Sequence, residues 1–320
     1  MSVNAGNASS GETPEISITI VNYNTKDLSR QCLASIIQNT HVPFEVFLVD
    51  NASKDGSADA LQEEFPGVHV IRNDVNVGLA AATNQGLCES RGRYLLALNS
   101  DTVILPGSLD RLAKFLDDHP DAGAATARLV GPNGTEHPPI CGDVPTLKVL
   151  IDEAVSPFAG DKGNGNPSRR VEMDYSKTQE IKCVHWGTAF LVRKSVYDEI
   201  GGQDARFFIY AEDVDWSMRI SKAGWKIYYV AESEVIHYGG QSTKQASTVM
   251  LGFLWKSKCR LIGKHYGFIS GLLLRTVVTG VCLLRLCKWE LLFATRPNLR
   301  SNAGIRIGQM RAIIRAAATP

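Results

Sequence analysis

The sequence has no C-x-x-C pair, no apolar leader and no large net charge, since Lys and Arg outnumber Asp and Glu by only one over the whole chain. Its seven cysteines are spread out, odd in number and without a C-x-x-C pair, which argues against a disulfide framework and a zinc cage and favours a reducing compartment. Residues 1–15 are polar and lack the apolar core of a secretion signal, so we expect a flexible leader. The chain has 320 residues, of which 44% are hydrophobic and 21% charged. This composition excludes a wholly disordered chain, collagen and a coiled coil, and predicts a packed globular protein.

Charge is unevenly distributed along the chain. From Leu251 onward there are 12 Lys or Arg residues and one acid, Glu290, a net charge of +11. The first 250 residues carry a net charge of −10. We therefore expect an acidic catalytic body and a basic tail that binds an anionic partner, such as a phospholipid surface, a lipid-linked phosphate or nucleic acid.

Short β-branched runs alternate with helical patterns from residue 16 onward. This spacing predicts an α/β fold, with a Rossmann-like, mostly parallel central sheet and flanking helices. The expected strands are 16–22, 44–50, 68–72 and 94–99, and the expected helices are 27–38, 57–64, 79–89 and 107–118. Between residues 131 and 182 the sequence is rich in Pro, Gly and Asn, which predicts a long functional loop. Regular structure is expected again at 183–193, with a helix at 213–223 and a strand at 225–231.

Polar residues follow each of the first four expected strands. They are Asn22-Tyr23-Asn24, Asp50-Asn51-Ala52-Ser53, the segment 73–78, and Asn99-Ser100-Asp101. Ligands bind at the carboxyl ends of strands in such sheets, so these residues predict one crevice. No G-x-G-x-x-G follows the first strand and no G-x-x-x-x-G-K-[ST] occurs, which argues against a dinucleotide oxidoreductase and a P-loop NTPase.

Three features carry candidate chemistry, each beside a structural alternative. Asp101 is placed to hold a hard divalent cation at the crevice; the structural alternative is a helix N-cap or a turn aspartate. The cluster Glu212-Asp213-Val214-Asp215 is placed either to cap a helix or to supply a general base. His237 is a metal ligand or a structural histidine.

Taken in order, these motifs resemble a known family. With Asn76-Val77-Gly78, Asn84 and Gly187-Thr188-Ala189, they are similar to the inverting family 2 glycosyltransferases of GT-A fold. Within that family they look most like the rhamnosyltransferase branch that acts on polyprenyl-diphosphate sugars. The resemblance runs from about Ile16 to Ser242.

The resemblance implies a role for each matching residue. Asp213 is implied as the catalytic base, with Glu212 and Asp215 orienting the acceptor or the site. Asp101, with His237, is implied to hold Mg²⁺ or Mn²⁺, although Asn99 replaces the first carboxylate of the family's D-x-D motif. The implied donor-binding residues are Asn22, Tyr23, Asp50, Asn51, Arg72, Asn76, Gly78, Asn84, Asn99, Ser100, Asp101, Trp186 and Gly187. A packed aromatic at Tyr23, and turn or cap residues at Asp50, Asn76, Gly78 and Asn84, are the structural alternatives.

The expected organisation is a leader at 1–15, a catalytic domain at 16–247 and a basic helical tail at 248–320. The segment 131–182 is expected on the acceptor side of the catalytic domain. In the tail, Arg275, Arg285 and Lys288 interrupt the apolar stretch from Phe268 to Phe293, which argues against a membrane-spanning helix and for one lying at an anionic membrane surface. Docking on the body or on a second copy is the alternative, so homo-oligomer formation stays open.

The function implied is inverting transfer of a sugar to a lipid-linked, polyprenyl-diphosphate saccharide in cell-wall or surface-polysaccharide synthesis. The expected donor is dTDP-L-rhamnose, and the expected location is peripheral, at the cytoplasmic face of the membrane. UDP-galactofuranose, UDP-glucose or UDP-GlcNAc are alternative donors, and a non-catalytic tethering scaffold is an alternative of another class. The long apolar stretch of the tail argues against nucleic acid as partner.

Overall fold

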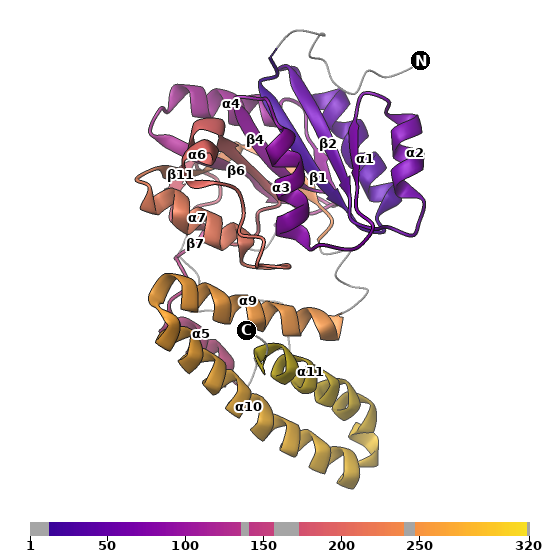
Figure 1. The fold of residues 1–320 in the computed structure, drawn as a ribbon, viewed down its shortest axis with the longest axis vertical. Helices are drawn as coiled ribbons and strands as arrows, with labels where there is room; N and C mark the ends of the chain where they lie inside the picture. The colour runs from indigo at the N-terminus through magenta and orange to yellow at the C-terminus, as the bar shows by residue number, and fades with distance from the viewer. Residues whose placement is uncertain (1–12, 136–140, 157–172, 240–246, 319–320) are drawn as a thin grey trace. The chain divides into compact units, whose positions relative to one another are not determined.

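The computed structural model describes residues 13–135, 141–156, 173–239 and 247–318. These residues form two compact units (Figure 1). Of the described residues, the first unit comprises 13–135, 141–144, 173–206 and 212–239, and the second comprises 145–156, 207–211 and 247–318. Most of the expected leader lies outside the described residues.

The first unit is built on a nine-stranded sheet, which confirms the expected α/β class. Its order is β3-β2-β1-β4-β10-β6-β11-β5, with β8 paired to β11. The strands on this path are β1 (Ile16–Asn22), β2 (Phe44–Asp50), β3 (His69–Arg72), β4 (Tyr94–Asn99), β5 (Thr102–Ile104), β6 (Ala122–Val130), β10 (Ala189–Arg193) and β11 (Lys226–His237). β8 is Gln179–Ile181, and β7 (Cys141–Gly142) pairs with β9 (Cys183–Val184) in a separate small sheet.

The strands β1 to β4 are parallel, as the alternation of strands and helices predicts. β1 and β2 are buried almost throughout, because both faces of the sheet are covered. The strand β10 departs from the parallel pattern, since it pairs antiparallel with both β4 and β6. Its reversed direction brings the residues before Ala189 to the carboxyl end of β4.

Helices connect the strands and pack on the sheet (Figure 1). They are α1 (Lys26–Asn39), α2 (Ser57–Glu64), α3 (Leu79–Glu89), α4 (Ser108–Asp118), α6 (Lys194–Ile200) and α7 (Glu212–Lys222). The first four agree with the expected helices within a residue at each end. α4 buries Leu109, Leu112 and Leu116, one apolar stripe at helical spacing.

The strand β11 is longer than the sequence predicts. We expected it to end at Ala231, but it continues to His237. A shift of register between Val230 and Glu234 lets it keep pairing with β6, and its last three residues pair with β5. His237 is therefore the last residue of a strand and does not lie beyond it, because a bulge extends the pairing past the polar segment where we ended the strand.

The second unit is helical and has its own core. It contains α5 (Leu147–Val155), α9 (Ser247–Tyr266), α10 (Phe268–Thr295), α11 (Arg300–Ala318) and the short 3₁₀ helix η2 (Pro297–Leu299). Side chains from all four α-helices form one buried cluster: Leu150, Ala154, Trp255, Cys259, Ile262, Leu274, Val278, Cys282, Met310 and Ile313. The basic, apolar tail is thus helical, as expected.

The helix α5 lies where the sequence predicts only loop. The Thr146 hydroxyl accepts a hydrogen bond from the Val149 N–H and caps its start, and Leu150 and Ala154 are buried. This segment groups with the C-terminal helices, whereas we assigned all of 131–182 to the acceptor side of the catalytic domain. We missed this short amphipathic helix because the residues around it are rich in Pro and Gly.

The helix α10 runs for 28 residues without a break at Arg275, Arg285 or Lys288. By length and composition it could cross a membrane, and 22% of its most apolar window is buried inside the structure. The three basic residues within α10 therefore argue less strongly against a membrane-spanning helix than we expected from the sequence. The surface location stays a prediction.

Candidate active site

The polar strand ends meet at one edge of the sheet. Asn22 is paired with Asp50 across β1 and β2, Asp50 with Arg72 across β2 and β3, and Val21 with Asn99 across β1 and β4. The Asn99 N–H donates to the Thr188 carbonyl at the start of β10, 2.9 Å away. The carboxyl ends of four strands and the segment before β10 therefore lie together, as expected for one crevice.

Asn22 joins the first two loops of the crevice. Its side chain is fully buried, and its Nδ2 donates to Asp50 Oδ1 at 2.7 Å. The same amide contacts four hydroxyls, those of Thr25, Ser29, Ser53 and Ser57. Thr25 in turn is 3.0 Å from the Ser100 hydroxyl. Because its amide is occupied within the protein, Asn22 shapes the crevice and offers no group for direct contact with a ligand.

Asn51 fixes the third loop. Its Oδ1 accepts the Val77 N–H at 3.0 Å, and its Nδ2 donates to Asn76 Oδ1 at 3.0 Å. Asn76 Oδ1 also accepts the Gly78 N–H. Gly78 has a φ of 89°, in the region that favours glycine, and directly precedes α3. Asn76 and Gly78 thus act as turn and cap residues in the structure, and their implied donor-binding role stays a prediction.

Four other predicted donor-binding residues have different surroundings. Arg72 forms an ion pair with Asp59 at 3.0 Å and donates to Gln62, so it is held by α2. Asn84 clamps the backbone of Gln203 by two hydrogen bonds. Tyr23 is half-buried beside the crevice loops, and Trp186 is 42% exposed.

Asp101 and His237 lie together at the end of β4 and β11. The distance from His237 Nε2 to Asp101 Oδ1 is 3.3 Å, and both side chains are buried. The backbone holds the pair in place, because Thr102 is the β-partner of His237 and the Tyr238 N–H donates to the Asp101 carbonyl. A carboxylate oxygen and an imidazole nitrogen suit Mn²⁺ or Mg²⁺. No group of three or more metal-binding side chains occurs in the described ranges. By themselves, Asp101 and His237 would supply only part of a coordination sphere.

Asp213 is held at the start of α7 by backbone N–H groups. Its Oδ2 accepts the Gly187 N–H at 2.7 Å, and its Oδ1 accepts the Val214 N–H at 2.7 Å. Gly187 precedes β10, whose neighbour β4 ends at Asn99, so Asp213 and Asp101 are anchored at the same end of the sheet. A Cβ atom on Gly187 would lie 3.0 Å from the Cβ of Asp213. Glycine therefore allows the close approach that this hydrogen bond needs.

Glu212 and Asp213 form a buried acidic pair. Burial raises the pKa of Asp213 above its usual range, and burial together with the charge of Asp213 raises the pKa of Glu212. Glu212 Oε2 is buried and has no hydrogen-bond partner among the described residues. A carboxyl with a raised pKa binds a proton more strongly near neutral pH, which suits a general base.

Asp215 has a structural partner that the sequence analysis missed. It is fully buried and pairs with Arg219 at 2.9 Å, one helical turn later. Arg219 also donates to the carbonyls of Ile200 and Gly202. This arrangement is consistent with an orienting role for Asp215. The i,i+4 spacing of Asp215 and Arg219 was the signal for this pair.

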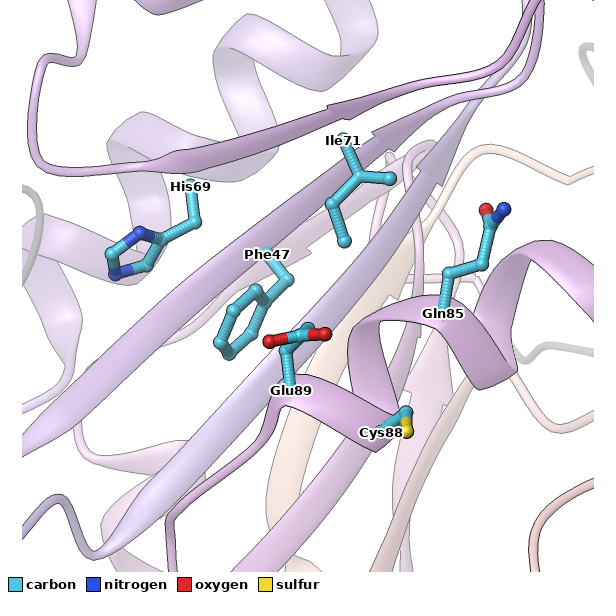
Figure 2. A pocket seen from close by; sticks show the side chains of 6 residues that line it. All are labelled: Phe47, His69, Ile71, Gln85, Cys88 and Glu89. Carbon is cyan, nitrogen blue, oxygen red and sulfur yellow. The ribbon is translucent and has the colours of Figure 1, made fainter.

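A surface pocket of about 530 Å³ lies between the sheet and α3 (Figure 2). Phe47, His69 and Ile71 line it from β2 and β3, and Gln85, Cys88 and Glu89 line it from α3. The rings of Phe47 and His69 stack with centroids 5.1 Å apart. None of the predicted site residues lines the pocket. All seven cysteines lie among the described residues and are free thiols, as expected.

Solved structures share this fold at low sequence identity. A structure of S. aureus TarS residues 1–349 matches with a TM-score of 0.51 and 15% identity, over 95% of this chain and 81% of that one. The mannosyltransferase PcManGT from Pyrobaculum calidifontis, solved in complex with GDP-Man and Mn²⁺, matches with a TM-score of 0.55 and 15% identity, over 95% and 87%. These matches confirm the GT-A fold.

Sequence comparison identifies the family to which the chain belongs. The N-acetylglucosaminyl-diphospho-decaprenol L-rhamnosyltransferase of Mycobacterium tuberculosis is 29% identical over 244 residues, 72% of this chain and 78% of that protein. The O-antigen biosynthesis protein RfbC of Myxococcus xanthus is 26% identical over 77% of this chain and 19% of its own length. Residues 17–201 match the family described as Glycosyl transferase family 2, and residues 167–301 match Glycosyl transferase family group 2. The chain therefore belongs to glycosyl transferase family 2, in its rhamnosyltransferase-like branch, and is a glycosyltransferase.

Proposed function

We propose that the protein transfers L-rhamnose from dTDP-L-rhamnose to a polyprenyl-diphosphate-linked saccharide, with inversion at the anomeric carbon. The observation that carries this proposal is the buried Asp213 carboxyl, fixed by the Gly187 N–H at the edge where the strand ends meet. The activity of the M. tuberculosis relative supports the choice of sugar and acceptor.

The proposed chemistry is a single displacement. Asp213 takes the proton of an acceptor hydroxyl while that oxygen forms a bond to the anomeric carbon. The bond between this carbon and the diphosphate oxygen breaks on the opposite side, and the nucleoside diphosphate leaves. The raised pKa of Asp213 supports its role as base, because it strengthens proton uptake near neutral pH. The pKa of Asp213 is raised by its burial, and the charge of Asp213 in turn helps raise the pKa of the neighbouring Glu212.

We propose that Asp101 and His237 hold Mg²⁺ or Mn²⁺. Their side chains are 3.3 Å apart and offer one hard oxygen and one imidazole nitrogen, a partial ligand set that phosphate oxygens would complete. When bound, such a cation neutralises negative charge on a leaving diphosphate. The Mn²⁺ in the P. calidifontis mannosyltransferase structure supports a divalent ion.

We further propose that the protein acts on its acceptor at the cytoplasmic face of the membrane, as a peripheral protein. A saccharide on a polyprenyl diphosphate presents its hydroxyls near the bilayer surface. The net charge of +11 after residue 250 favours that anionic surface. UDP-galactofuranose, UDP-glucose and UDP-GlcNAc remain the alternative donors, since the geometry around Trp186 and Gly187 does not by itself select a sugar.

The test is release of nucleoside diphosphate from a panel of dTDP- and UDP-sugars, with GlcNAc-diphosphoryl lipid dispersed in detergent as acceptor. We expect turnover of dTDP-L-rhamnose that needs both the acceptor and Mg²⁺ or Mn²⁺. Turnover of another donor would keep the mechanism and replace the sugar. A protein that binds none of these donors would contradict the enzymatic proposal and favour the tethering scaffold.

A further inference from the structure

The helix α10 has two opposite faces of different character. Gly271, Leu274, Val278 and Cys282 recur every three or four residues and are buried against the other helices of the second unit. Directly opposite lie six large apolar side chains that are 46% to 80% exposed. They are Ile269, Leu272, Leu273, Leu283, Leu284 and Leu291, which we call the apolar face of α10.

No charged residue interrupts the apolar face between Leu273 and Leu283. Thr276 and Gly280 occupy it there, and both are exposed. Arg275, Arg285 and Lys288 fall to the sides or the back of the helix, because each residue advances about 100° around the axis. Arg285 donates to the Ser156 carbonyl within the second unit. The face extends over about 33 Å, at about 1.5 Å per residue from Ile269 to Leu291.

We propose that the apolar face of α10 inserts into the outer layer of an anionic membrane, with the helix lying parallel to the surface. A contiguous exposed apolar strip of this length marks an interaction site, whereas single exposed apolar side chains do not. The inference rests on the proposed peripheral location and is independent of which sugar is transferred.

Charge identifies a lipid surface as the occupant. Residues 251–320 carry 12 basic residues and one acid, so an anionic headgroup layer complements the segment that bears the face. A second copy would bring another net charge of +11 against the first, which opposes association through this face. Nucleic acid would satisfy the charge but leave six large apolar side chains in water.

The packing of α10 favours a position along the surface over a transmembrane one. α10 packs against α9 and α11, and these three helices share one core with α5. Lys256, Lys258, Arg260 and Lys264 lie along α9, and Lys258 is engaged with Glu153 of α5. Crossing the bilayer would carry these cationic helices into hydrocarbon, which is costly. Insertion of one face leaves them at the headgroup level.

The experiment is flotation of the full-length protein with phosphatidylglycerol-containing vesicles and with vesicles of phosphatidylcholine alone. The test variant is Leu272→Ser with Leu284→Ser. The control is Val155→Ser with Val249→Ser, which removes exposed apolar side chains of the same unit outside the face. We expect the test variant to bind anionic vesicles about 100-fold more weakly than the wild type, and the control to bind within a few fold of it. Circular dichroism shows whether each variant keeps its helices.

Three results would overturn the proposal. The first is equal vesicle binding by the wild type and the test variant, or no binding by either. The second is a dimer in sedimentation equilibrium without vesicles that the test variant abolishes, because the occupant would then be a second copy. The third is retention of the protein in the bilayer after alkaline carbonate extraction, which indicates a spanning helix. Sugar transfer to an acceptor in detergent is measured in parallel, so failure of the proposed function is seen separately.

Discussion

At the scale of single residues, the proposed chemistry depends on two consecutive buried carboxyls, Glu212 and Asp213. Asp213 is fixed by two backbone N–H groups, whereas Glu212 Oε2 has no partner among the described residues. The sequence pattern singled out these acids as candidate site residues, but it did not predict their burial or their hydrogen bonds. The hydrogen bond from Gly187 joins residues 26 positions apart, so only the fold reveals it.

Replacement of Gly187 by alanine should misplace the base. The new Cβ would stand 3.0 Å from the Cβ of Asp213, so one of the two segments must move. We expect kcat to fall about 10- to 100-fold, because a displacement of this size disturbs the geometry of attack. Steady-state kinetics with saturating donor measures the effect, and circular dichroism checks the fold. Undiminished kcat would show that the Gly187 contact does not position Asp213.

Glu212→Gln should make the protein more stable at alkaline pH. The pKa of Glu212 is raised in the folded state, so the folded protein holds a proton that the unfolded chain releases. Stability therefore falls as the pH rises above the ordinary carboxyl range, and glutamine removes that loss. We expect a gain of roughly 1–3 kcal/mol at about pH 8 that vanishes near about pH 4. Denaturant unfolding at several pH values measures it.

The matched control for that experiment is Glu63→Gln, on the exposed side of α2. The stability of Glu63→Gln should differ little from that of the wild type at every pH, because the exposed Glu63 carboxyl is hydrated in both the folded and the unfolded state. A gain in Glu212→Gln that does not depend on pH would indicate a packing effect and contradict the ionisation argument.

At the scale of elements, the sequence predicted the parallel half of the sheet well and the later elements less well. Strands β1 to β4 have strong β-branched runs, so periodicity located their ends within a residue or two. β11 was misjudged because a bulge extends its pairing with β6, and α5 was misjudged because its buried residues pack on helices distant in sequence. The crevice could be predicted since it follows from the strand ends alone.

The close approach of α9 and α10 depends on a pair of glycines. A Cβ on Gly271 would lie 2.7 Å from the Cα of Gly263, so Gly271→Ala forces the two helices apart. We expect a loss of about 1–3 kcal/mol in the stability of the helical unit. Thermal unfolding followed by far-UV circular dichroism measures the change.

Gly280→Ala on the same helix is the control, because a Cβ there meets nothing within 4 Å. This variant should be more stable by about 0.5–1 kcal/mol, since alanine favours the helix. If both variants shift stability in the same direction, the contact between Gly263 and Gly271 does not limit the packing of the two helices.

At the scale of the whole molecule, charge and fold divide along similar lines. The acidic part of the chain forms the sheet unit that carries the crevice, and the basic part forms most of the helical unit. Composition alone indicated an acidic body and a basic tail. The assignment of residues 145–156 to the helical unit could not be predicted, because Leu150 and Ala154 pack on helices that begin about a hundred residues later. The apolar face of α10 likewise emerged only once the other helices defined which side is buried.

The central claim is that Asp213 is the base of a glycosyl transfer, and the most direct measurement is a comparison of donor binding with turnover in Asp213→Asn. Asparagine is nearly isosteric with aspartate but cannot take the acceptor proton. We predict that donor affinity in the presence of Mn²⁺ stays within a few fold of the wild type, while kcat falls by about 10³-fold or more. Wild-type turnover by Asp213→Asn would contradict the account.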